Sequence, residues 1–288
     1  MRWYKKYLKV YGTPLEGISE EQIGEIASQL KVLQNAKPLV TVSVIAYNEE
    51  KNLLACLWSL SEMKCSYPVE IIGVNNNSKD RTEEVFQKTG IPYFNESRNS
   101  CGYARQCGLQ NAKGKYHINI DADTLYPPGY VQRMVEELLK PNVVAVSAFW
   151  SYIPDKRHSG FSLTSYEVFR DIYLTLQSIK RPELSVRGLV FAYKTELARK
   201  IGIRVELLRG EDGSLAFALK KYGKIAFVYS REARPVTGYG TLDADGSLFN
   251  SFRTRFVKAI RSIPGLFSRK THYRDQDSNL IDGFKKEN

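Results

Sequence analysis

The 288-residue sequence lacks several patterns that would assign it to a common class of protein. No apolar run approaches the roughly 18 residues that a membrane-spanning helix needs, and no apolar stretch follows the basic N-terminal residues, as it would in a secretory signal. The phosphate-binding signatures GxxxxGK[ST] and GxGxxG are both missing. We therefore expect a cytoplasmic, globular protein that is neither a P-loop enzyme nor a Rossmann-type dinucleotide enzyme.

Cysteine and histidine are also scarce, with four and three residues respectively. The cysteines are Cys56, Cys65, Cys101 and Cys107; they form no CxxC pair and have no histidine at zinc spacing. We expect reduced, mostly buried thiols and no structural zinc site.

The net charge of +11 calls for an acidic partner. The basic residues show no nucleic-acid-binding signature and no interleaved Gly-aromatic repeat, so we expect no nucleic-acid partner. Residues 249–263 would form a basic amphipathic helix, whose apolar face consists of Phe249, Phe252, Phe256, Ala259, Ile260 and Ile263. This helix would either pack on its own domain or lie on an anionic membrane, and both interpretations stay open.

Strand and helix patterns alternate along most of the chain. Buried strands are predicted at 39–47, 70–75, 93–95, 116–121, 143–150, 189–193 and 224–229. Helices are predicted between them at 49–60, 80–89, 102–112, 129–139, 163–179 and 213–222. The alternation predicts an α/β fold with a doubly wound, mixed but mostly parallel sheet flanked by helices. A helical N-terminal extension, 1–38, contains a capping box that begins at Ser19.

Two carboxylates end the strand at 116–121. Asp121 and Asp123 are one residue apart and would repel unless a cation neutralises them. Oxygen ligands of this kind suit Mg²⁺ or Mn²⁺. The alternative is a solvated turn, because aspartate is common after strands.

Two further polar clusters follow neighbouring predicted strands. The first is Ala46-Tyr47-Asn48-Glu49, and the second runs from Asn75 to Asp80. Because the carboxyl ends of parallel strands meet at one edge of a sheet, we expect these clusters and Asp121 to line one crevice. Taken singly, such residues are also ordinary turn and helix-cap residues.

These motifs, in this order, resemble the family 2 inverting glycosyltransferases of GT-A fold. Residues 42–50 (VSVIAYNEE) resemble the first block of the family, and 70–82 (EIIGVNNNSKDRT) resemble the second. Asp121-Ala122-Asp123 resembles the family's DxD motif, and Gly210-Glu211-Asp212 resembles its acidic motif on the acceptor side. The resemblance covers residues from about 40 to 230 and implies a GT-A domain at 39–235, with a nucleotide-binding half (39–125), an acceptor-binding half (126–235) and a basic C-terminal extension (236–288).

The resemblance implies a role for each matching residue on the donor side. Asp123 would bind a divalent metal, Mn²⁺ or Mg²⁺, and His272 would either complete the metal shell or be a surface histidine. Asp121 and Ala122 would contact the ribose or the metal shell. Tyr47, flanked by Ala46 and Asn48, would pack beside the base, while Glu49 and Asn76 would hold base and ribose. Arg105 would either face the nucleotide or lie on the helix surface.

The resemblance also implies an acceptor side. Asp212 would be the general base, and Glu211 would raise its pKa by like charge. Both residues could instead cap the helix predicted to follow them. Arg187 and Gly188 would line the acceptor site.

Departures from the family pattern limit what can be transferred. The usual Asp-Asp-Gly becomes Asn75-Asn76-Asn77, which leaves the donor base open between uracil, guanine and others. The Gln-x-x-Arg-Trp motif of processive synthases is absent, so transfer of single sugars fits better.

We therefore expect a metal-dependent inverting glycosyltransferase that adds one sugar from a nucleotide-diphosphate donor to a glycan or lipid-linked acceptor in cell-envelope polysaccharide synthesis. It would work in the cytoplasm, with or without peripheral contact at the inner face of the membrane. The alternatives are a catalytically silent nucleotide-sugar-binding module and a nucleotidyltransferase. The latter would need a glycine- and basic-rich loop that residues 46–49 do not provide.

Overall fold

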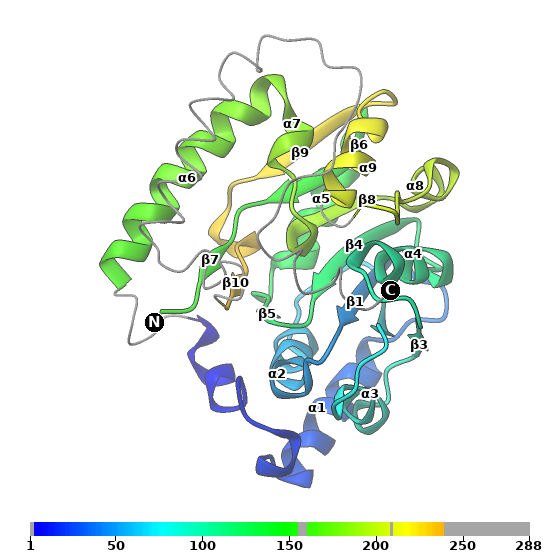
Figure 1. The fold of residues 1–288 in the computed structure, drawn as a ribbon, viewed down its shortest axis with the longest axis vertical. Helices are drawn as coiled ribbons and strands as arrows, with labels where there is room; N and C mark the ends of the chain where they lie inside the picture. The colour runs from blue at the N-terminus through cyan, green and yellow to red at the C-terminus, as the bar shows by residue number, and fades with distance from the viewer. Residues whose placement is uncertain (1–2, 155–159, 208–209, 239–288) are drawn as a thin grey trace.

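The computed structural model describes residues 3–154, 160–207 and 210–238 (Figure 1). A central sheet has the strand order β3-β2-β1-β4-β8-β6-β9. Its strands are β1 (Val40–Ala46), β2 (Val69–Asn75), β3 (Tyr93–Asn95), β4 (Tyr116–Asp121), β6 (Val143–Ala148), β8 (Phe191–Lys194) and β9 (Lys224–Val228). Only β8 runs antiparallel to its neighbours, β4 and β6. The predicted mixed, mostly parallel sheet is thus confirmed.

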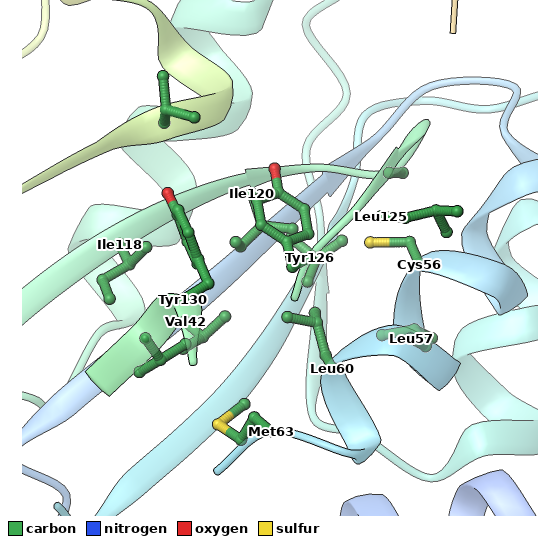
Figure 2. Packing of buried hydrophobic residues seen from close by; sticks show 14 of the residues in the cluster. Val42, Cys56, Leu57, Leu60, Met63, Ile118, Ile120, Leu125, Tyr126 and Tyr130 are labelled. Carbon is green, nitrogen blue, oxygen red and sulfur yellow. The ribbon is translucent and has the colours of Figure 1, made fainter. Parts of the chain in front are cut away.

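Helices cover both faces of this sheet, which is why β1 and β2 are buried along their whole length. The helices are α1 (Glu20–Leu33), α2 (Glu50–Ser61), α3 (Thr82–Thr89), α4 (Cys101–Asn111), α5 (Tyr130–Leu138), α6 (Gly160–Lys180), α7 (Pro182–Ser185), α8 (Thr195–Ile201) and α9 (Glu211–Leu219). Side chains of α1, α2, α3 and α5 form one core cluster, and those of α4, α8 and α9 form a second. Figure 2 shows part of the first cluster, to which Leu57 and Leu60 of α2 and Val42 of β1 belong.

The N-terminal extension packs on the domain. A 3-10 helix, η1 (Trp3–Lys9), contacts α2 through Tyr7, whose ring meets Trp58 edge-on at 5.1 Å and whose hydroxyl donates to Glu62 at 3.0 Å. The predicted N-cap of α1 is confirmed, because the Ser19 side chain accepts a hydrogen bond from the backbone N–H of Gln22. The extension therefore shares the core of the domain that follows it.

A small second sheet joins distant parts of the chain. β10 (Val236–Thr237) lies between β5 (Thr124–Leu125) and β7 (Ser151–Tyr152). These strands have two residues each, too short for a periodic pattern, and the sequence did not predict them. The sheet brings Thr237 beside Thr124, directly after the DxD motif.

Helix α6 runs along the outer edge of the molecule (Figure 1). It buries Leu163 and Leu174 but exposes Val168, Ile172, Leu176 and Ile179, the last at 74%.

Among the described residues, no helix is both long and apolar enough to cross a membrane. All four cysteines are free thiols, but only Cys56 is buried, whereas Cys65 and Cys107 are partly exposed and Cys101 is exposed, so the expectation of mostly buried thiols is wrong. The amphipathic helix predicted at 249–263 lies outside the described residues.

Candidate active site

The three predicted polar clusters lie at one edge of the sheet, where β1, β2 and β4 end. Ala46 pairs with Asn75, and Ile45 pairs with Asp121, so the three polar clusters leave the sheet at the same level. The loops are tied together: the Lys79 N–H donates to Asn48 Oδ1 at 2.8 Å, and the Asn48 N–H donates to Ser78 Oγ at 3.0 Å. Asn48 has a left-handed φ of 53°, which asparagine tolerates better than most residues. The expected convergence is therefore present.

Carboxylates gather at this edge. Burial, followed by the charge of Asp123, raises the pKa of Glu49 to about 7. Burial, followed by the charge of Asp121, raises the pKa of Asp123 to about 6. The charge of Asp121 thus acts on Asp123, and the charges of both aspartates act on Glu49.

Asp123 is held by residues that the sequence did not single out. The Tyr11 hydroxyl donates to the Asp123 backbone carbonyl at 2.9 Å. The Thr124 hydroxyl lies 3.0 Å from Asp123 Oδ1 and 2.9 Å from the hydroxyl of Thr237. Tyr11 and Thr237 lie 112 and 114 positions away from Asp123, so no local pattern could have found them.

The residues around Asp123 fit a divalent cation. A hard cation is favoured by carboxylates whose charges oppose one another, which is the arrangement of Asp121, Asp123 and Glu49. Among the described residues, however, no three His, Cys, Asp or Glu side chains are grouped as a ready-made metal site. Asp123 would therefore share its cation with ligands from the substrate. His272 lies outside the described residues.

Arg105 lies at the centre of a second charged cluster. Its side chain is only 4% exposed, so the surface-helix alternative is wrong. Its Nη2 lies 3.0 Å from Asp121 Oδ1, and its Nε lies 3.4 Å from Glu211 Oε1 and 3.3 Å from Asp212 Oδ1. One buried guanidinium thus joins the DxD motif to the acidic motif at the start of α9.

Asp212 also accepts a hydrogen bond from Asn119. The distance from Asn119 Nδ2 to Asp212 Oδ1 is 3.2 Å, and the Tyr193 hydroxyl fixes the Asn119 amide by donating to its Oδ1 at 3.1 Å. Burial raises the pKa of Asp212; Arg105 opposes this rise, and the charge of Glu211 adds to it. Glu211 and Asp212 lie inside the first turn of α9, whose N-cap position is Gly210 with no side-chain capping hydrogen bond, so neither carboxylate caps the helix as the alternative predicted.

Gly188 lies against both Arg105 and Asp212. A Cβ atom at this position would come within 1.8 Å of Arg105 Nη2 and 2.5 Å of Asp212 Oδ2. Only glycine leaves room for the two side chains here. Next to it, the Arg187 guanidinium donates to the carbonyls of Leu184 and Val186 and so supports the turn into Gly188.

Asn76 is engaged inside the protein. Its Nδ2 donates to the carbonyls of Glu96 and Arg98 at 3.2 and 2.7 Å, and its Oδ1 accepts from the Ser100 N–H at 3.1 Å. An aspartate could not donate the first two bonds. Because both hydrogens of Nδ2 are used, the predicted contact of Asn76 with a base could be made only through the second lone pair of Oδ1.

The remaining predicted residues fall into two groups. Tyr47 is 40% exposed at the crevice edge, where a base could pack against it. Ala46 and Ala122 are buried and contribute backbone: the Ala46 carbonyl accepts from the Asn76 N–H at 2.8 Å, and the Ala122 N–H donates to the Ile45 carbonyl at 3.2 Å.

The chain is similar in sequence to known glycosyltransferases. Over 197 residues the chain is 27% identical to an uncharacterized glycosyltransferase of Rickettsia prowazekii, covering 67% of this chain and 61% of that protein. The chain therefore spans about three fifths of the length of this relative.

Two solved structures share the fold. A mannosyltransferase from Pyrobaculum calidifontis, in complex with GDP-Man and Mn²⁺, superposes with a TM-score of 0.59 at 19% identity, covering 84% of this chain and 72% of that one. The glucosyl-3-phosphoglycerate synthase of Mycobacterium tuberculosis, in complex with Mn²⁺, UDP-glucose and phosphoglyceric acid, superposes with a TM-score of 0.53 at 20% identity, covering 82% and 83%. The fold is therefore GT-A.

The family comparison covers the residues that build this edge of the sheet. The profile described as Glycosyl transferase family 2 matches residues 41–202, more than half of the sequence. The matched region contains Glu49, Arg105, the DxD motif and Gly188, and it ends shortly before the acidic motif at Asp212. The chain belongs to glycosyl transferase family 2.

Proposed function

We propose that this protein is a metal-dependent, inverting glycosyltransferase that moves one sugar from a nucleotide-diphosphate donor to a hydroxyl of a glycan or lipid-linked acceptor. The observation that carries the proposal is the buried Arg105, which joins a donor-side carboxylate, Asp121, to an acceptor-side carboxylate, Asp212. A metal site and a base held in fixed relation are what a direct sugar transfer requires.

On the donor side, Asp123 would hold Mn²⁺ or Mg²⁺. When bound, the ion would act as a Lewis acid that stabilises the diphosphate as it leaves the sugar. Tyr47 offers an exposed ring for the base, and Glu49 lies beside Asp123 to receive the ribose or the metal shell. GDP-mannose and UDP-glucose both occur in structural neighbours, which supports a nucleotide sugar without choosing the base.

On the acceptor side, Asp212 would take the proton from the acceptor hydroxyl. The hydroxyl oxygen then forms a bond to the anomeric carbon as the bond from that carbon to the diphosphate oxygen breaks. A single displacement of this kind inverts the anomeric configuration. Burial raises the pKa of Asp212 and makes it a stronger base than a solvated carboxylate. Because Gly188 has no Cβ, the Asp212 carboxylate and the Arg105 guanidinium can both occupy the position next to it.

The acceptor proposal extends to a lipid-linked glycan of the cell envelope. Helix α6, with its exposed apolar side chains, leads through α7 directly to Arg187 and Gly188. An apolar surface this close along the chain to the proposed acceptor site suits a molecule that carries a lipid, and it supports peripheral contact at the inner face of the membrane.

Titration calorimetry of UDP, GDP, CDP and dTDP, with and without Mn²⁺, tests the donor site. We expect one nucleotide to bind in a manganese-dependent way, and we expect Asp123→Ala to lose this dependence. Absence of any manganese-dependent binding would contradict the proposal.

The base assignment needs a second variant. Asp212→Asn should keep donor affinity within about twofold and lose 10²- to 10⁴-fold in transfer rate. Normal transfer by this variant would disprove the assignment, and a product that retains the anomeric configuration would disprove inversion. A wild-type protein that binds the donor but neither transfers nor hydrolyses it would be the silent binding module.

A further inference from the structure

Residues from outside the family-matched region fix the backbone at Asp123. The matched region is 41–202, whereas Tyr11 belongs to the N-terminal extension and Thr237 to the last described strand. The Tyr11 hydroxyl donates to the Asp123 carbonyl, and Thr237 reaches the Asp123 carboxylate through the Thr124 hydroxyl. The peptide and the carboxylate of one residue are thus held by residues on both sides of the family-matched region.

The Tyr11 ring is itself firmly placed. It packs against the main core cluster, and the Tyr11 N–H donates to the Tyr7 carbonyl at 3.0 Å. The next residue, Gly12, has a φ of 78° and donates its N–H to the Lys51 carbonyl of α2 at 2.9 Å. This left-handed turn is accessible to glycine and aims the chain back at α2.

The Tyr11 hydroxyl lies among charged and crowded neighbours. Burial, followed by the charges of Asp123 and Glu49, raises the pKa of the Tyr11 phenol, so it remains a hydrogen-bond donor at neutral pH. On another side, a Cβ atom added at Gly238 would come within 2.7 Å of the hydroxyl oxygen. The hydroxyl therefore has a defined position beside the proposed metal site.

We propose that Tyr11 is a positioning residue for the metal-binding aspartate, so that the N-terminal extension forms part of the donor site. By holding the Asp123 carbonyl, Tyr11 restricts rotation of the Asp123–Thr124 peptide and so fixes the backbone from which the carboxylate projects. Groups that orient a metal ligand contribute to metal affinity without touching the metal. This inference rests on the proposed function.

The test compares two hydroxyl deletions within the same extension of the full-length protein. Tyr11→Phe removes the bond to Asp123, whereas Tyr7→Phe removes the bond to Glu62, away from the site. With the nucleoside diphosphate that the wild type binds, we expect Tyr11→Phe to raise the Mn²⁺ concentration for half-saturation by about tenfold. Metal-free nucleotide affinity should stay unchanged in both variants, and Tyr7→Phe should keep the wild-type manganese dependence.

A second variant approaches the hydroxyl from its other side. Gly238→Ala would crowd the Tyr11 hydroxyl and should also weaken manganese binding. If Tyr11→Phe and Gly238→Ala both bind Mn²⁺ as the wild type does, Tyr11 has no positioning role. Equal manganese affinities for Tyr11→Phe and Tyr7→Phe, with equal loss of thermal stability, would likewise reduce Tyr11 to a packing residue. Failure of the wild type itself to bind nucleotide in a manganese-dependent way would instead reject the proposed function, and the role of Tyr11 with it.

Discussion

Arg105 and Asp212 form a buried ion pair, with Nε 3.3 Å from Oδ1, although they lie 107 residues apart in the sequence. Because the same guanidinium also binds Asp121, any shift of α4 would be felt by both the donor side and the acceptor side of the proposed site. If Asp212 is the base, it must accept the proton of the acceptor hydroxyl while it is still paired with Arg105. The ion pair should therefore affect both the stability of the protein and the rate of transfer.

Replacing Arg105 should reduce both the stability of the protein and its transfer rate. Arg105→Ala leaves the largely buried Glu211 and Asp212, and the partly exposed Asp121, without their cation, and it should lower the free energy of unfolding by about 3–5 kcal/mol. Arg105→Lys keeps the charge but loses the planar fork, so we expect a smaller loss of stability with a large loss of transfer rate. Urea unfolding and turnover measurements check this. As a control, Arg133→Ala breaks an exposed cluster with Glu136 and Glu232 and should cost less than about 1 kcal/mol.

Gly188→Ala should disrupt the same contact from the other side. Its Cβ would clash with Arg105 Nη2 and Asp212 Oδ2, so we expect a destabilised protein with little transfer activity. The matched control is Gly24→Ala in α1, where a Cβ meets no atom within 4 Å. Because alanine favours helices, that change should raise stability by about 0.5–1 kcal/mol. The melting temperatures of the two variants, compared with that of the wild type, measure these effects. A well-folded, active Gly188→Ala protein would contradict the close packing of Gly188 against Arg105 and Asp212.

Glu183 should control stability at acid pH. Burial by itself would raise its pKa, but hydrogen bonds from Lys220 of the α9 cap and from Arg181 lower it below its usual range. A depressed carboxylate pKa means that these bonds stabilise the fold fully above the unfolded value of about 4.5 and are lost as the pH falls through the folded value. Glu183→Gln should therefore cost about 2–3 kcal/mol at pH 7, with a smaller difference from wild type near pH 3. Urea unfolding at several pH values measures this, and a constant difference would refute it.

The exposed face of α6 should mediate contact with lipid. We expect Ile172→Gln combined with Leu176→Gln to reduce sedimentation of the full-length protein with anionic vesicles severalfold, because two exposed apolar side chains are lost. Leu139→Gln removes another exposed leucine, at the end of α5, and should leave sedimentation unchanged. If the α6 variant sediments as the wild type does, the helix is not the contact surface.

Much of the fold could be predicted from the sequence because its elements are long and strictly periodic. β1 and β4 are continuous apolar or alternating runs followed by polar residues, and their ends fell within one residue of the prediction. α8 was missed because it follows β8 without an intervening turn signal, and β5, β7 and β10 were missed because each has two residues.

The candidate site could be predicted only for residues that directly follow a strand and belong to a sequence motif of the family. Glu49 follows β1, and Asp121 and Asp123 lie at the end of β4, so the prediction that they share one edge of the sheet could be made from the strand pattern. The burial of Arg105 depends on Glu211 and Asp212, which come from a helix more than a hundred residues later, so the sequence left its environment open. The turn of the Asn76 side chain into the 96–100 loop likewise depends on carbonyl groups that no residue type specifies.

Tyr11 and Thr237 support Asp123 from the two sides of the family-matched region, and this has a practical consequence for protein engineering. A fragment trimmed to residues 41–202, the region that the family shares, would retain the DxD sequence but would lose Tyr11 and Thr237 together. Such a fragment would present the aspartate on an unsupported turn. Chimaeras that exchange the family-matched region between relatives should therefore also exchange the segments before and after it that contain Tyr11 and Thr237.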